Sequence, residues 1–117
     1  MKRHPMAIPH AFPGMPVDLR PADESLSEAR TTALVKNNTF EAIRPVLPQG
    51  SEVCHNHQVE GAITLQCLRG RAALTVGDST HDLRAGHWLY LLGDDPHTLR
   101  GIEDSLVLLT IIFPQRP

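Results

Sequence analysis

The chain has 117 residues, of which 41% are hydrophobic and 21% charged, and its formal net charge is −2. This composition is typical of one ordinary globular domain, and a chain of this length can bury a working core. Acids and bases are mixed without a basic cluster and no apolar run approaches the roughly 18 residues of a membrane span, so we expect neither a nucleic-acid nor a membrane partner.

Residues 1–30 are expected to form an extended arm that ends in a short helical turn. The first 21 residues carry prolines that exclude a helix or a central strand, namely Pro5, Pro9, Pro13, Pro16 and Pro21. This arm would be a mobile tail or a segment lying on the domain or on a partner. Residues 23–30 favour a helical turn, because acids near the start and Arg30 at the end suit the helix dipole. No apolar leader precedes the domain, so we expect a cytoplasmic protein whose two cysteines are free thiols.

From Thr31 onward the pattern predicts an all-β domain that spans residues 31–117. Short apolar runs alternate with glycines, which is typical of an antiparallel sandwich or barrel; the clearest runs are residues 62–68, 72–76, 88–92 and 106–113.

Two turns of this domain have the residues of β-hairpins. Asn37-Asn38 predicts one hairpin, because asparagine tolerates positive φ. Gly77-Asp78-Ser79 predicts a second, which joins residues 72–76 to residues 80–83. Within the strand 72–76, alternate residues are apolar, so one face of that strand is expected to be buried.

Three histidines form a candidate metal site. His55 and His57 stand two residues apart, and His97 follows about forty residues later. In a strand, residues i and i+2 point to the same face, so the pair can converge on one ion. Imidazole is a ligand for iron, manganese, nickel, zinc and copper, so the residues predict a divalent transition metal without identifying it. A solvated pair near a loop, with a structural His97 and no metal at all, is the alternative.

The stretch from Gly50 to His97 resembles the two sequence motifs of the cupin superfamily. The first motif is matched by Gly50, by His55-Asn56-His57 and by Gly70, and the second by Gly86 and His97. The resemblance implies a single antiparallel β-barrel or double-stranded β-helix (jelly roll) in which the three histidines bind a metal. The chain departs from the motifs at the glutamate ligand, whose position is occupied by Ile63.

In the register that the resemblance implies, Ile63, Leu65 and Cys67 share a face that lines the barrel. Together with Leu91 they would form a mostly apolar ligand pocket behind the histidines. Such a pocket predicts a small-molecule ligand with one anchoring polar or anionic group. Cys67 is interpreted first as a small buried hydrophobic residue and only second as a functional thiol.

These features predict a small cupin-domain protein that binds a transition metal and a small molecule. If it is an enzyme, a metal-dependent dioxygenase or isomerase type is expected, and no residue can be named as catalytic. The alternative is a metal-free cupin, which acts as a small-molecule binding module or as a structural dimer without catalysis.

A homodimer is also expected. The last strand, residues 106–113, is apolar on both faces, and Trp88 and Tyr90 share a face that the barrel interior does not accommodate. Two-fold pairing would cover this surface, and the proline-rich arm could cross to the partner. In the competing account the arm folds back over its own sheet and the monomer is complete.

Overall fold

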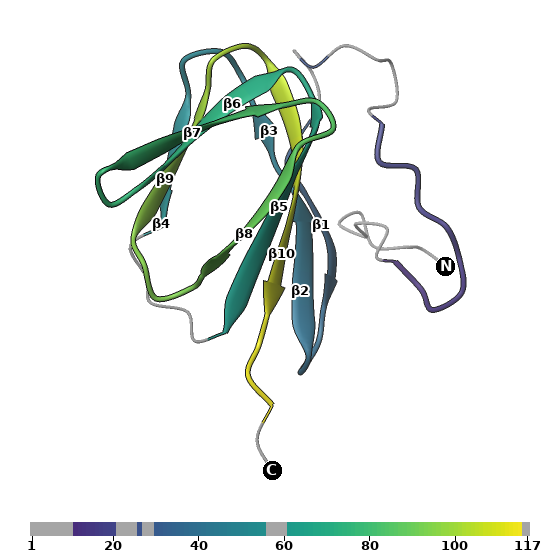
Figure 1. Cartoon of the computed structure of the whole chain (residues 1–117). Coiled ribbons are helices and arrows are strands. Elements are labelled where there is room, and N and C mark those ends of the chain that lie inside the picture. Colours follow the sequence, from purple (N-terminus) through teal and green to yellow (C-terminus); the bar gives the residue numbers. More distant parts are fainter. Residues whose placement is uncertain (1–10, 21–25, 27–29, 56–60, 116–117) are drawn as a thin grey trace.

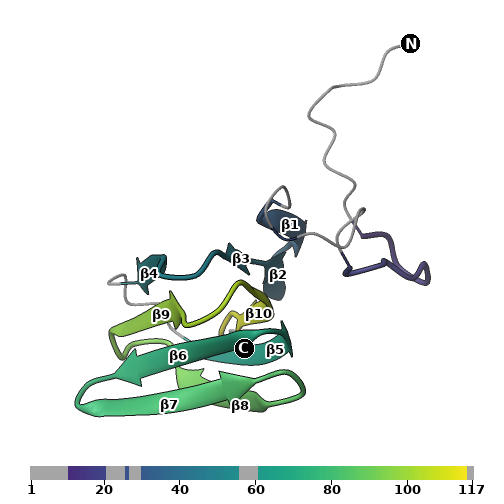
Figure 2. The same ribbon diagram turned by 90° about the horizontal axis from the view of Figure 1, so that it is seen from above.

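The computed structural model describes residues 11–20, 26, 30–55 and 61–115, with only the backbone of Cys54 and His55. These residues form ten antiparallel strands in two sheets that face each other (Figures 1 and 2). The larger sheet contains β1 (Thr32–Lys36), β2 (Phe40–Arg44), β3 (Val46–Leu47), β5 (Ala62–Arg69), β8 (Trp88–Leu92) and β10 (Ser105–Ile112). The smaller sheet contains β4 (Glu52–His55), β6 (Arg71–Val76), β7 (Ser79–Arg84) and β9 (His97–Gly101).

The all-β prediction is confirmed, whereas a single closed barrel is not found among the described strands. The larger sheet has the order β1-β2-β10-β5-β8, with β3 paired to β10, and the smaller sheet has the order β4-β9-β6-β7. The chain passes from one sheet to the other at bends, such as that at Gly70 between β5 and β6, so each sheet keeps its own edges. The fold is therefore the two-sheet form of a jelly roll.

Both predicted hairpins are confirmed. Asn37 closes the β1–β2 turn, since its side-chain oxygen accepts hydrogen bonds from the amides of Thr39 (2.8 Å) and Phe40 (3.0 Å). The β6–β7 turn contains only Gly77 and Asp78, because Ser79 already pairs with Val76. The second strand of this hairpin thus starts one residue earlier than predicted.

One apolar core lies between the two sheets, and strand alternation decides which residues enter it. The predicted inward residues of β5 are buried, and the inward residues of β6 and β8 are buried except for Val76 and Leu89, which are partly buried against the core. The core is built from Leu47, Ile63, Leu65, Cys67, Ala72, Leu74, Leu83, Leu91, Leu99, Val107 and Leu109.

The described part of the arm, residues 11–20, is irregular and runs alongside the β1 edge of the larger sheet (Figure 1). The Ala11 amide donates to the Leu34 carbonyl at 2.8 Å. Arg44 of β2 is only 8% exposed and donates to the carbonyls of Leu19 (3.1 Å) and Arg30 (2.7 Å). Most of the predicted helical turn at residues 23–30 lies outside the described residues.

Gly70 makes the bend between the sheets possible for two separate reasons. Its φ of +84° lies in the left-handed region, which side chains disfavour. A Cβ at this position would also overlap the Asp104 carbonyl and would lie 2.9 Å from the Cα of Ser105. The backbone of the turn before β10 therefore packs directly on this glycine.

We predict that Gly70→Ala destabilises the protein by about 1–3 kcal/mol more than Gly86→Ala, the range typical of overpacking. Gly86 is the matched control, because its φ is +93° and a Cβ there would meet open space. Both variants are destabilised because alanine disfavours the left-handed backbone conformation, but only Gly70→Ala adds the steric overlap. Urea unfolding of the two variants measures the difference, and equal losses would show that the close approach at Gly70 contributes nothing.

Candidate functional site

His97 opens β9 and is the best-defined residue of the candidate site. Its neighbours on alternate positions, Leu99 and Gly101, are also buried, so His97 belongs to the inward face of the strand, and it is 4% exposed. Its Nδ1 lies 3.2 Å from the Asp95 carbonyl oxygen. A carbonyl can only accept, so Nδ1 carries the proton in this bond, and the neutral ring then has its lone pair on Nε2. The Nε2 atom is shielded from solvent.

The strand register brings a second predicted ligand next to His97. In the antiparallel pair β4–β9, His55 lies directly opposite His97. Residues that face one another in this way share a side of the sheet, with their Cβ atoms about 4.5–5.5 Å apart. On its other side His97 pairs with Val76 of β6. His97 therefore lies between the backbone position of His55 on β4 and Val76 on β6.

The third predicted ligand, His57, lies outside the described residues, as does the side chain of His55. Within the described ranges, no group of three or more His, Cys, Asp or Glu side chains could hold a metal ion. The predicted site is thus represented here by one buried imidazole and by the backbone position of a second histidine.

The four predicted pocket residues all lie in the core between the sheets. Ile63 pairs directly with Leu91 across the β5–β8 ladder, and Leu65 and Cys67 are fully buried on the same face of β5. The position that a glutamate ligand occupies in the cupin motif is therefore filled here by Ile63, an aliphatic residue with aliphatic neighbours.

No protein-family model and no curated protein matches this sequence. Among solved structures, the protein is similar to a conserved protein of unknown function from Streptococcus pyogenes, with a TM-score of 0.75 and 21% identity over 93% of this chain and 96% of that one. It is also similar to an RmlC-like cupin protein from Desulfovibrio desulfuricans, with a TM-score of 0.64 and 23% identity over 96% of each chain. The chain has the cupin fold.

The same cupin fold recurs in part of a larger enzyme. Salicylate 1,2-dioxygenase from Pseudoaminobacter salicylatoxidans matches with a TM-score of 0.58 and 19% identity, over 63% of this chain and 21% of that one. In the described part of the chain, no helix is long and apolar enough to cross a membrane.

Cys67 has the surroundings of a structural thiol rather than of a nucleophile. Burial raises its pKa, and its Sγ lies 3.5 Å from the Arg69 carbonyl oxygen and 3.8 Å from that of Gly70. Both neighbours accept hydrogen bonds, which a protonated thiol can donate and a thiolate cannot. The neutral form is therefore favoured.

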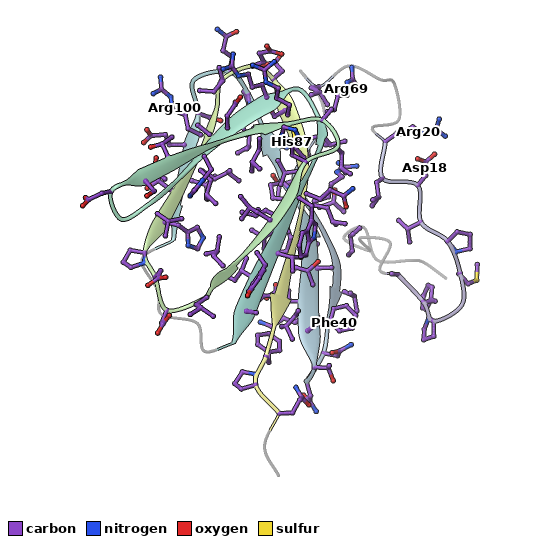
Figure 3. The ribbon with its side chains drawn as sticks, in the orientation of Figure 1. Asp18, Arg20, Phe40, Arg69, His87 and Arg100 are labelled. Atoms are coloured by element: carbon purple, nitrogen blue, oxygen red, sulfur yellow. The ribbon has the colours of Figure 1, made fainter. Side chains whose placement is uncertain are left out.

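Sequence reasoning missed a hollow between the arm and the outer face of β1 and β2. Its volume is about 520 Å³, and it is lined by Phe12, Met15, Pro16, Val17, Asp18, Thr32, Leu34 and Arg44. Asp18 is bridged to Arg20 at 2.9 Å, and both lie exposed on the arm (Figure 3). This pairing lowers the pKa of Asp18 to about 2. Arg44, which follows the apolar residues Phe40 and Ala42 at alternate positions of β2, was the available signal for this hollow.

We predict that Cys67 reacts with a thiol reagent at pH 8 only when the protein unfolds, because reactivity requires an accessible thiolate. The Cys54→Ser variant leaves Cys67 as the sole cysteine and makes the measurement specific. Its labelling rate should rise at least about a hundredfold between buffer and denaturing urea, since a fully buried site reacts only through rare opening. Comparable rates in the two conditions would contradict the buried, protonated thiol.

Proposed function

We propose that this protein is a small cupin that binds one divalent transition metal through His55, His57 and His97, together with a small-molecule ligand. The observation that carries the proposal is the burial of His97, with Nδ1 held on a backbone carbonyl and His55 directly opposite in the register. Metal-binding histidines commonly donate their second ring nitrogen to a carbonyl, which orients the ring and leaves the other nitrogen for the metal.

The donor set fits a borderline metal ion rather than a hard one. Neutral imidazoles suit iron, nickel, copper and zinc, and sites with three histidines bind zinc in enzymes. Because Ile63 stands in place of a carboxylate, the neutral histidine ligands would not offset the positive charge of the ion. A bound metal would supply Lewis-acid polarisation at its open coordination positions.

The ligand class follows from charge and from the walls of the site. An uncompensated cation beside aliphatic residues favours a ligand with one anionic or strongly polar group and an apolar body. Ile63, Leu65, Cys67 and Leu91 would exclude water around that body. Any catalysis would be of the dioxygenase or isomerase type, in line with the dioxygenase that shares the fold.

A metal-free cupin, acting as a binding module or a structural dimer, is the second candidate. It is favoured by the replacement of the family glutamate by Ile63, which is buried in the core. In this case His97 would have a structural role, to which its hydrogen bond with the Asp95 carbonyl contributes.

We predict that the protein purified without a histidine tag takes up one equivalent of a transition metal, and that His97→Ala reduces this to less than about a tenth, as expected for loss of a first ligand. His81→Ala is the matched control, because His81 is an exposed histidine on β7. Mass spectrometry of the dialysed protein after incubation with manganese, iron, nickel, copper or zinc gives the stoichiometry.

The free energy of unfolding provides a second measurement that is independent of activity. A metal present at a hundred times its dissociation constant should stabilise the wild type and His81→Ala by about 2.7 kcal/mol. His97→Ala should gain nothing over its own stability in chelator, which separates loss of the metal from a general packing defect. A wild-type protein that neither binds nor is stabilised by any of these metals would exclude the proposal and leave the metal-free cupin.

A further inference from the structure

Arg44 is a buried cation, and no carboxylate of the described residues forms an ion pair with it. It is 8% exposed, and its Nη1 and Nη2 atoms donate to the carbonyls of Leu19 and Arg30 and to the hydroxyl of Thr32, which are all neutral. Its Nε atom is shielded from solvent and has no acceptor among these residues. Because a buried charge without a counter-ion costs free energy, this guanidinium is suited to an anion that the described part of the chain does not supply.

The hollow between the arm and the outer face of β1 and β2 gives such an anion access to the guanidinium. Arg44 forms part of its wall, and its volume of about 520 Å³ lies in the range of small-molecule sites. On the arm, Phe12, Met15 and Val17 line the same hollow and are 65%, 63% and 40% exposed. The hollow therefore combines one cationic group with apolar surface that a ligand would cover.

A β-bulge in β1 contributes a further apolar wall. The register of β1 against β2 shifts between Ala33 and Val35, so Leu34 is an extra residue at this point. Bulges change the direction in which a side chain points and are frequent beside functional sites. Leu34 lines the hollow, and its carbonyl holds the arm through the Ala11 amide.

A second hollow, of about 340 Å³, adjoins the first at Phe12, which lines both. Its other walls include Pro13, Val35 and Phe40, and none of the described residues that line it is charged. Phe40 and Arg44 belong to the same face of β2, four residues apart, which is roughly 13 Å along a strand. A ligand with its head group at Arg44 can thus extend an apolar chain toward Phe40.

The acidic residue of the first hollow does not cancel the charge of Arg44. Asp18 is already bound by Arg20, whose Nε and Nη2 atoms donate to its two carboxylate oxygens at 2.9 Å each (Figure 3). This pair is neutral as a whole. Among the described residues, the charge that remains for a ligand in the hollow is therefore that of Arg44, which favours an anion over a neutral molecule.

We propose that this hollow binds a small monocarboxylate with an unbranched apolar chain, its carboxylate at Arg44 and its chain along Phe12. Hydrogen bonds from a guanidinium to a carboxylate are among the strong ones, and the flexible Met15 side chain can adapt to the chain of the ligand. Because Nε is shielded, we expect the arm to shift when the carboxylate takes this donor. The site is separate from the proposed metal site, since His97 belongs to the inward face of β9 and the hollow lies outside the core.

Isothermal titration calorimetry of the full chain with octanoate and with octanol tests the proposal. The two probes share one apolar chain and differ in the charged group. Octanoate should bind with one equivalent and roughly tenfold to a hundredfold more tightly than octanol, as expected for a hydrogen bond to a charged group. A chelator in the buffer keeps metal out of the histidine site, so the result does not depend on the proposed function.

Two variants locate the carboxylate. Arg44→Gln should bind octanoate no better than octanol, but it also removes hydrogen bonds that join the arm to the sheet. Val17→Glu therefore provides a second measurement: it places a like charge at the wall of the hollow and should weaken octanoate binding roughly tenfold or more. Val53→Glu is the matched control, because Val53 is 37% exposed and lies on β4, two residues before His55. It should bind octanoate like the wild type, and circular dichroism should show that all three variants are folded.

Either of two results would overturn the proposal. The first is a wild type that binds octanoate no more tightly than octanol, which would show that Arg44 has a structural role only. The second is a loss of octanoate binding in Val53→Glu but not in Val17→Glu, which would place the carboxylate beside the histidines rather than under the arm.

Discussion

Burial of one apolar face from each of the two sheets is the interaction on which the rest of the structure depends. Leu65, Leu74 and Val107 come from three different strands and are all fully buried. Each such side chain contributes about 1.5–3 kcal/mol relative to exposure. Because successive residues of a strand point to opposite sides, committing one residue to this layer determines the side of all its neighbours.

That constraint is the reason the sequence predicts some parts of the molecule well. Alternation within β5 and β6 identifies Cys67 and Leu74 as inward residues, and it also places Trp88 and Tyr90 together on one face. The turn residues Asn37 and Gly77 act locally, so they identify both hairpins. The inward position of His97 follows from the same alternation, since Leu99 lies two residues later on the same face.

Features that depend on contacts between distant segments were not predictable in this way. Nothing local indicates that β10 lies between β2 and β5, or that the strands form two sheets with open edges rather than one closed barrel. Arg44 forms hydrogen bonds with Leu19, which lies 25 positions earlier in the chain, and with Arg30, which lies 14 positions earlier. The motif glycine at position 70 was recognisable by resemblance, but its close approach to the backbone at Asp104 appears only in the folded chain.

The surroundings of Arg44 bear on where the folding unit begins. Within the described residues its acceptors are the carbonyls of Leu19 and Arg30 and the hydroxyl of Thr32, all of them neutral. These oxygens replace part of the water shell that a buried guanidinium has lost, while its buried Nε atom has no acceptor among the described residues. Lysine could not substitute simply, because its ammonium lacks the planar fork that reaches acceptors in two directions. A chain trimmed to the strands at residue 31 would leave this cation without two of its acceptors, so in energetic terms the arm is part of the domain.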